Sequence, residues 1–85
     1  MASVIIYGTE QCKWCDKAKE LAGDYNITWE FRNIILEGFY EEIKALQPSF
    51  RTVPQIVWNG TYIGGYEKFA FEIENTIGGY GDGAF

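Results

Sequence analysis

A strand, a helix and a second strand follow one another within residues 3–34, and this order constrains the fold more than any other feature of the chain. Residues 3–7 are short, β-branched and aromatic, which predicts a buried strand. Residues 13–23 predict a helix that stops at Gly23. Its apolar stripe consists of Cys15, Ala18, Leu21 and Ala22. Residues 27–34 alternate apolar and polar side chains, as in a strand with one wetter face. We expect the two strands to lie parallel, because a helical crossover joins them.

The rest of the chain predicts a second helix, a hairpin and a last helix. Residues 37–46 form the second helix, which Pro48 closes. Residues 54–58 and 61–63 are strands joined by Asn59-Gly60, a pair typical of a two-residue hairpin turn. The last helix runs from Tyr66 to about Ile77. The apolar stripes of the two helices are Phe39, Ile43 and Leu46, then Phe69, Ile73 and Ile77.

The predicted order β-α-β-α-β-β-α gives an α/β fold with a four-stranded mixed sheet and helices available to cover both of its faces. Eighty-five residues are enough for one small domain. We expect this domain to span residues 1–77, followed by a glycine-rich flexible tail over residues 78–85. No run of about 18 apolar residues is present, so a membrane span is not expected. No export signal is recognisable either, and we expect a cytoplasmic protein.

The charge and the residue types exclude several classes of function. The net charge is −5, from 7 Lys and Arg against 12 Asp and Glu, so nucleic acids and anionic lipid surfaces are not expected as partners. Histidine is absent, which excludes Cys/His catalytic pairs and His metal sites. The 2 cysteines cannot complete a four-thiolate zinc site within one chain.

The two cysteines, Cys12 and Cys15, lie where the first strand gives way to the first helix. A disulfide between them closes a very short loop, which constrains the unfolded chain little. Chemistry in a reducing compartment explains the pair better than a stabilising role. Unpaired amides and the helix dipole should lower the pKa of Cys12 from about 8.5 into the range of about 3.5–7.5, and Lys13 acts in the same direction. Cys12 is then the attacking thiolate, and the more buried Cys15 resolves the mixed disulfide. Two ordinary core thiols, or a metal-binding pair, are the alternatives.

Three motifs in a fixed order resemble the glutaredoxin family, in particular the short glutaredoxins of bacteria and their viruses. They are Cys12-Lys13-Trp14-Cys15, Thr52-Val53-Pro54 and Gly64-Gly65-Tyr66-Glu67. The resemblance covers residues 2 to about 77. It implies a thioredoxin-like fold with Pro54 in the cis form. The implied activity is that of a dithiol glutaredoxin, which uses glutathione to reduce protein disulfides and glutathione mixed disulfides. Ribonucleotide reductase is the protein partner that the resemblance suggests.

The resemblance also implies a glutathione site. Val53 offers backbone groups to which glutathione or a peptide can pair as an added strand. The N–H groups of Tyr66 and Glu67 bind the γ-glutamyl carboxylate, Glu67 accepts the ammonium, and Arg51 pairs with the glycyl carboxylate. The implied binding residues are Lys13, Trp14, Arg51, Thr52, Val53, Pro54, Gly65, Tyr66 and Glu67.

Each of these roles has a plainer alternative. Pro54 is also tolerated as the first residue of a strand, and Gly64-Gly65 also suits a tight turn between a strand and a helix. Glu67 is also a favourable acid in the first turn of a helix. Arg51 and Trp14 are then a solvated cation and an exposed aromatic ring.

The chain departs from the family pattern at four positions. Lys13 and Trp14 stand where proline and tyrosine are frequent, which leaves the redox potential open. Thr9 replaces a common lysine, so we expect one cationic contact to glutathione to be missing. Lys68 replaces a frequent acid, so the ammonium contact rests on Glu67 alone.

Two other functions remain open at this stage. A thioredoxin-like reductant would take electrons from a flavoprotein reductase without glutathione, although Gly64-Gly65 argues against it. A metal-handling protein or a glutathione-ligated [2Fe–2S] dimer would use Cys12 as a ligand, and bulky Trp14 argues against the cluster. We expect a monomer whose only small-molecule cofactor is glutathione, without a metal.

Overall fold

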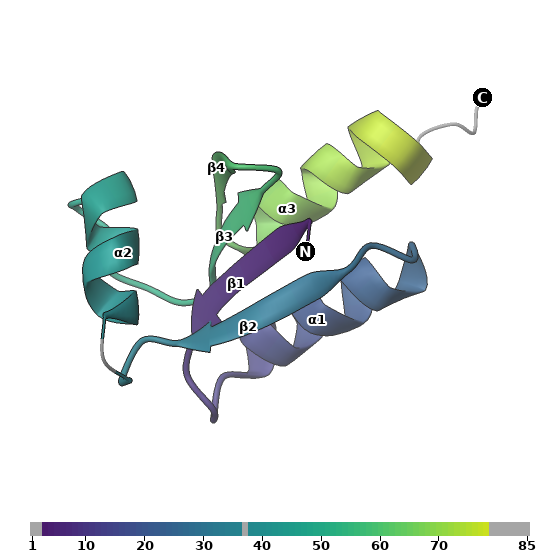
Figure 1. Ribbon diagram of the computed structural model, residues 1–85. Helices are drawn as coiled ribbons and strands as arrows, with labels where there is room; N and C mark the ends of the chain where they lie inside the picture. Colours follow the sequence, from purple (N-terminus) through teal and green to yellow (C-terminus); the bar gives the residue numbers. More distant parts are fainter. Residues whose placement is uncertain (1–2, 37, 79–85) are drawn as a thin grey trace.

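The computed structural model describes residues 3–36 and 38–78 (Figure 1). The first half contains β1 (Val4–Gly8), α1 (Lys13–Asp24), β2 (Trp29–Asn33) and α2 (Phe39–Leu46). The second half contains β3 (Gln55–Trp58), β4 (Thr61–Gly64), α3 (Tyr66–Ile73) and a π-helical turn, η1 (Glu74–Gly78). The predicted order of strands and helices is confirmed.

The four strands form one mixed sheet in the order β2-β1-β3-β4. β1 and β2 are parallel, with Val4 opposite Trp29. β3 runs antiparallel to both β1 and β4. Asn59 and Gly60 connect β3 to β4 with φ values of 51° and 82°, the left-handed conformation that a two-residue hairpin turn requires. The predicted parallel pair, hairpin and mixed sheet are therefore confirmed.

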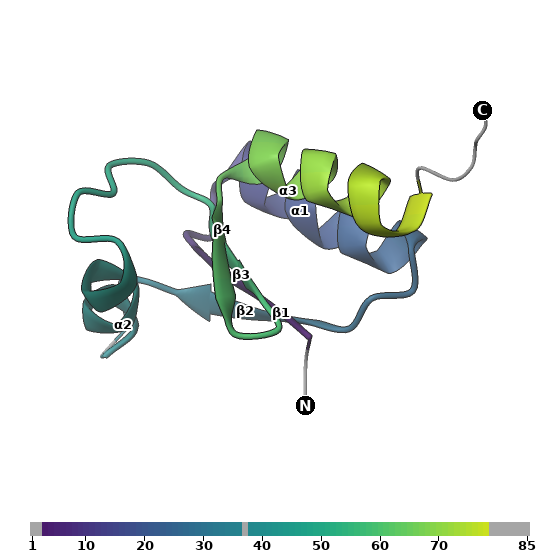
Figure 2. The same ribbon diagram turned by 90° about the horizontal axis from the view of Figure 1, so that it is seen from above.

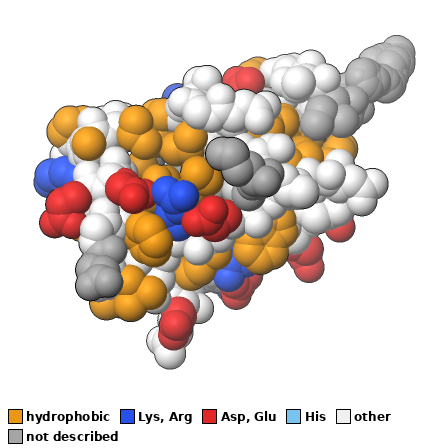
Figure 3. All heavy atoms as spheres, in the orientation of Figure 1, with side chains coloured by type: hydrophobic (Ala, Val, Ile, Leu, Met, Phe, Trp, Pro, Cys, Tyr) orange, Lys and Arg blue, Asp and Glu red, His pale blue; other side chains and the backbone are white. Residues whose placement is uncertain are grey.

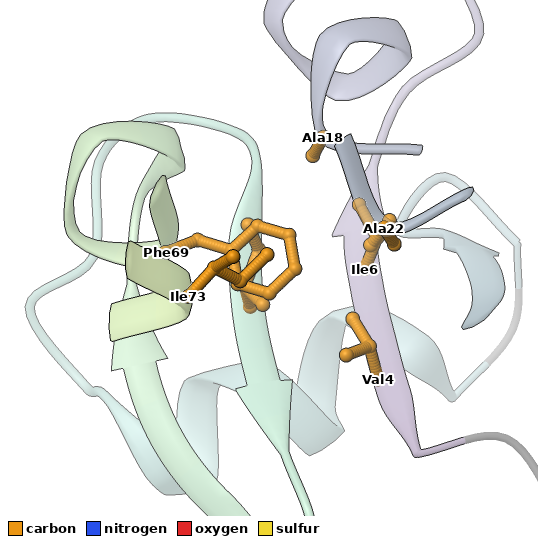
Figure 4. Packing of buried hydrophobic residues seen from close by; sticks show 7 residues of the cluster. Val4, Ile6, Ala18, Ala22, Phe69 and Ile73 are labelled. Atoms are coloured by element: carbon orange, nitrogen blue, oxygen red, sulfur yellow. The ribbon is translucent and has the colours of Figure 1, made fainter. Parts of the chain in front are cut away.

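Helices cover both faces of the sheet, as predicted. Figure 2 shows α1 and α3 side by side on one face and α2 on the other side. Side chains alternate along β1, so that Val4 and Ile6 pack beneath α1 and α3, while Tyr7 packs beneath α2. The larger cluster, drawn in Figure 4, consists of Val4, Ile6, Ala18, Ala22, Ile56, Phe69 and Ile73, all fully buried.

Three details of the helices differ from the sequence prediction. α1 runs past the predicted stop at Gly23 and ends at Asp24, with Tyr25 as its C-cap. Leu46 is 49% exposed, because α2 is short and buries only Ile43 fully against the sheet. The α-helical part of the last helix ends at Ile73 rather than near Ile77, and residues 74–78 continue as the π-helical turn. Apart from Gly78, the predicted tail lies outside the described residues, and so does the side chain of Ile77. Within residues 3–36 and 38–78, no helix has both the length and the apolar character needed to cross a membrane.

A polar cluster links α2 to the sheet. The hydroxyl of Tyr7 donates to Glu42 Oε1 at 2.9 Å, and Arg32 Nη1 donates to the same oxygen at 2.6 Å. Arg32 Nε pairs with Glu30 Oε2, also at 2.6 Å. In Figure 3, acidic and basic side chains lie next to one another among hydrophobic groups on this side of the molecule. Burial, and then the hydrogen bond to Glu42, raises the pKa of Tyr7 above its usual 10.0.

The raised pKa of Tyr7 predicts a loss of stability in alkali. The fold favours the protonated phenol, so its contribution is complete below pH 10.0 and is lost as the pH rises through the raised pKa. We expect the free energy of unfolding in urea to fall more steeply above this pH in the wild type than in Tyr7→Phe. Tyr40→Phe, which changes an exposed ring, should follow the wild type. Equal slopes for Tyr7→Phe and the wild type would contradict the prediction.

Candidate active site

The sulfur of Cys12 caps the first turn of α1. Cys12 has extended backbone angles, φ −119° and ψ 107°, and its Sγ accepts a hydrogen bond from the N–H of Cys15 at 3.1 Å. Its carbonyl accepts from the N–H of Asp16, also at 3.1 Å. This N-cap position places the sulfur at the positive end of the helix dipole, where a negative charge is stabilised.

Cys12 and Cys15 are joined by a disulfide and differ in exposure. Cys12 is 9% exposed and Cys15 is fully buried, so Cys12 is the one of the two that offers surface to an incoming thiol. Behind the pair, a Cβ placed on Gly8 at the end of β1 would collide with Cys15 Sγ. The buried sulfur therefore occupies space that only glycine leaves free. In the described ranges, His, Cys, Asp and Glu do not gather in a group of three or more that could hold a metal ion.

A cavity of about 560 Å³ lies beside the first turn of α1. Four separate segments form its wall, from the start of α1, the end of α2, the loop before β3, and β4 with the start of α3. The lining residues are Trp14, Gln47, Thr52, Val53, Pro54, Tyr62, Ile63, Gly64, Gly65, Tyr66, Glu67 and Lys68.

Trp14 and Tyr66 connect the first turns of α1 and α3. Their ring centroids are 5.3 Å apart, and the Nζ of Lys17 lies 5.7 Å from the centroid of the Trp14 ring. Half of the Trp14 side chain stays exposed. The amino-terminal ends of the two helices lie close together (Figure 2), and Trp14 and Tyr66 both line the cavity. Both helix ends favour a bound anion.

The opposite wall contains the bond between Val53 and Pro54, which is cis, as the family resemblance implies. Pro54 is buried and Val53 is half-buried. Gly64 has φ +129°, and a Cβ placed there would lie 3.1 Å from the Lys68 side chain, so this glycine serves the turn from β4 into α3. Gly65 has φ −84°, and a Cβ there would meet the Pro54 carbonyl at 3.8 Å, an ordinary contact distance, so neither its backbone angle nor the space around it requires glycine.

The structure brings most of the predicted binding residues together. Seven of them line the cavity: Trp14, Thr52, Val53, Pro54, Gly65, Tyr66 and Glu67. Lys13 and Arg51 are exposed and are not among its lining residues. Their contacts with glutathione stay predictions, because a long side chain can reach across a rim.

Five lining residues lie outside the predicted binding set, namely Gln47, Tyr62, Ile63, Gly64 and Lys68. Sequence reasoning also missed the role of Gly8 behind Cys15. The hairpin signal at Asn59-Gly60 places Tyr62 and Ile63 on β4, close to the Gly64-Gly65 motif, and this signal was sufficient to find them. For Gly8 no local signal exists, because its neighbour lies on another element.

The chain is similar to glutaredoxins throughout most of its length. The glutaredoxin family model matches residues 4–63. Glutaredoxin 1 of Escherichia coli is 32% identical over 81 residues, covering 86% of this chain and 94% of the relative. Human mitochondrial glutaredoxin-2 is 32% identical over 65 residues, covering 73% of this chain. This chain spans only 40% of the length of that longer relative.

Solved structures show the same likeness. The structure of reduced Escherichia coli glutaredoxin matches with a TM-score of 0.77 and 28% identity, covering 88% of this chain and 96% of that one. A buckwheat glutaredoxin–glutathione complex matches with a TM-score of 0.71 at 22% identity, over 87% of this chain and 70% of that one. The second likeness concerns the fold alone.

Proposed function

We propose that this chain, which belongs to the glutaredoxin family, is a glutathione-dependent thiol–disulfide oxidoreductase that works through Cys12 and Cys15. The observation that carries the proposal is the position of the Cys12 sulfur. It caps α1 and accepts the N–H of Cys15, while the Cys15 sulfur lies buried one turn further along. An accessible thiolate that is stabilised in this way, with a second thiol behind it, is suited to attack a disulfide and then release the product.

The reduction of a substrate takes two exchange steps. The Cys12 thiolate attacks one sulfur of the substrate disulfide, and the other sulfur leaves as a thiolate that takes up a proton. Cys15 then loses its proton and attacks the Cys12 sulfur, which releases the second substrate thiol and forms the Cys12–Cys15 disulfide. That oxidised form is the one the structure contains.

Glutathione regenerates the dithiol form. A first glutathione thiolate attacks the accessible Cys12 sulfur and displaces Cys15, which is protonated. A second glutathione attacks the glutathione sulfur of this mixed disulfide. The products are oxidised glutathione and the Cys12 thiolate, so two electrons enter the pair and two glutathione molecules form one disulfide.

The cavity beside α1 is the proposed glutathione site. A likeness in fold to a glutaredoxin that binds glutathione supports this assignment, and so do the two helix ends at the cavity. Val53 supplies backbone groups for pairing, and the N–H groups of Tyr66 and Glu67 receive the γ-glutamyl carboxylate. The Glu67 side chain accepts the ammonium. Lys13 and Arg51 contribute positive charge at the rim, and Trp14 contributes apolar contact.

The source of electrons tests the proposed function. We expect reduced glutathione, regenerated by glutathione reductase, to sustain reduction of a mixed disulfide between glutathione and a small thiol. A thioredoxin reductase system should sustain a much lower rate, because the two helix ends at the cavity suit the carboxylate of glutathione. The coupled loss of NADPH absorbance measures both rates. A higher rate with thioredoxin reductase would favour a thioredoxin-like reductant and contradict the proposal.

The partners and the cellular compartment are part of the proposal. We propose protein disulfides as substrates, ribonucleotide reductase among them because of the family resemblance. A dithiol pair that cycles through reduction by glutathione belongs in a reducing compartment, for which we propose the cytoplasm, and we propose that the chain acts as a monomer. Reduction of oxidised ribonucleotide reductase, measured by its recovered activity, checks the first of these.

A further inference from the structure

Gln55 is a buried polar side chain directly behind the loop that forms one wall of the cavity. Its side chain is 5% exposed, and it follows Pro54 at the start of β3. A buried amide needs hydrogen-bond partners on both its oxygen and its nitrogen, because it has lost its water. The mechanism outlined above gives this side chain no role.

Both ends of the Gln55 amide have partners. Its Oε1 accepts from the hydroxyl of Tyr62 on β4, and its Nε2 donates to the carbonyl of Thr52 at 2.8 Å. The Thr52 carbonyl accepts and cannot donate, so it requires the Nε2 end of the amide and fixes which way the amide points. With its oxygen turned towards Tyr62, the nitrogen is turned towards Thr52. Tyr62 therefore anchors the oxygen end of the Gln55 amide by donating to it, and Gln55 holds the Thr52 carbonyl.

The bond to Thr52 matters because of where it is made. Residues 52–54 form one wall of the cavity, and Pro54 has no N–H with which to fasten this loop. The Gln55 side chain supplies a donor in its place, from within the folded sheet. Tyr62 itself also lines the cavity.

We propose that Gln55 and Tyr62 are positioning residues that fix the Thr52–Pro54 backbone for pairing with the glutathione moiety of a substrate. The inference rests on the proposed function, since it concerns the same cavity. It assigns these two residues to substrate recognition and leaves the reactivity of the Cys12 sulfur to the end of α1. Loss of either residue should weaken the use of glutathione-containing substrates and spare the thiolate.

Two substitutions break the arrangement at different points. Gln55→Met keeps the length of the side chain and removes both hydrogen bonds. Tyr62→Phe removes a single hydroxyl and leaves the ring in the wall, so it is the variant of choice if Gln55→Met folds poorly. Tyr40→Phe is the matched control, because it removes a hydroxyl from an exposed ring that packs against Phe50 at a tilted angle and does not line the cavity.

Two rates separate positioning from general damage. The first is kcat/KM for a mixed disulfide of glutathione and a small thiol. The second is the rate at which iodoacetamide alkylates reduced Cys12. This reagent is small and does not need to bind the wall formed by residues 52–54. We expect kcat/KM to fall about tenfold in Gln55→Met and somewhat less in Tyr62→Phe, mainly through KM. Alkylation rates should stay within about twofold of the wild type. The pH at which the alkylation rate is half its maximum should not shift. In the double variant, Tyr62→Phe should add nothing, because it acts through Gln55.

The outcomes distinguish this inference from the proposed function. If the wild type fails to reduce the mixed disulfide with glutathione, the proposed function is wrong. If the wild type is active and both variants keep its kcat/KM, only the positioning role is wrong. Equal losses in kcat/KM and in alkylation would show general disturbance of the site and overturn the inference, as would independent effects of the two substitutions.

Discussion

Replacing Cys12 by serine should abolish turnover with glutathione. A serine hydroxyl at the helix end does not ionise near neutral pH and cannot form the mixed disulfide on which both exchange steps depend. We expect the rate of mixed-disulfide reduction to fall by more than about a thousandfold, to the uncatalysed background. The coupled loss of NADPH absorbance measures it, with unfolding in urea to verify that the variant is folded. Full activity of Cys12→Ser would reject the proposed chemistry.

Cys15→Ser is the matched control for this substitution. It removes the resolving thiol and keeps the accessible one, which is the sulfur that an incoming disulfide meets first. Removal of glutathione from a mixed disulfide needs only one thiolate, because a second glutathione completes the exchange. We therefore expect Cys15→Ser to retain this activity and to lose reduction of protein disulfides that require the dithiol. If Cys12→Ser kept this activity and Cys15→Ser lost it, Cys15 would be the attacking cysteine and Cys12 the resolving one.

Gly8→Ala should destabilise the protein although it adds a single methyl group. The added Cβ would collide with Cys15 Sγ and lie 3.3 Å from Cε1 of Phe31. Cys15 is fully buried, so its sulfur has no free space to enter. Overpacking of this kind costs about 1–3 kcal/mol, which lowers the unfolding temperature of a domain of this size by about 4–8 °C per kcal/mol. Thermal and urea unfolding of the oxidised protein measure the loss.

Gly23→Ala provides the control for Gly8→Ala. Gly23 lies in α1, and a Cβ placed there would meet nothing within 4 Å. Alanine restricts the unfolded chain and suits a helix, so this variant should be more stable by roughly 0.4–1 kcal/mol. Equal effects at the two positions would mean that the neighbouring sulfur does not explain the need for glycine at position 8.

The sequence was sufficient to predict the fold because its local signals agree with one another. The β-branched run at residues 3–7, the helical spacing of residues 13–23 and the turn at Asn59-Gly60 each predict a local element, and together they lead to the mixed sheet that the structure contains. The reactive pair was predictable for the same reason. Cys12 and Cys15 lie at a boundary between a strand and a helix, which the sequence alone marks.

What the sequence could not predict depends on contacts between distant elements. Leu46 fits the apolar stripe of α2, yet it is the last residue of the helix and stays 49% exposed. Gly8 is an ordinary strand residue until the sulfur of Cys15 is placed behind it. Glutamine is usually found at the surface, and only the folded structure reveals that Gln55 is hydrogen-bonded to Tyr62 and Thr52. The cis bond at Pro54 followed from family resemblance, since sequence physics favours trans.

The contact between Trp14 and Tyr66 affects how the molecule attracts or repels anions. Two converging helix ends gather partial positive charge at one point of a chain whose net charge is −5. At physiological salt, mobile ions screen the repulsion between the charged surface and an anion that is more than about 8 Å away. At shorter range, the partial positive charge of the two helix ends attracts an anion. An anion that lies between the two helix ends is therefore stabilised there despite the net negative charge of the chain.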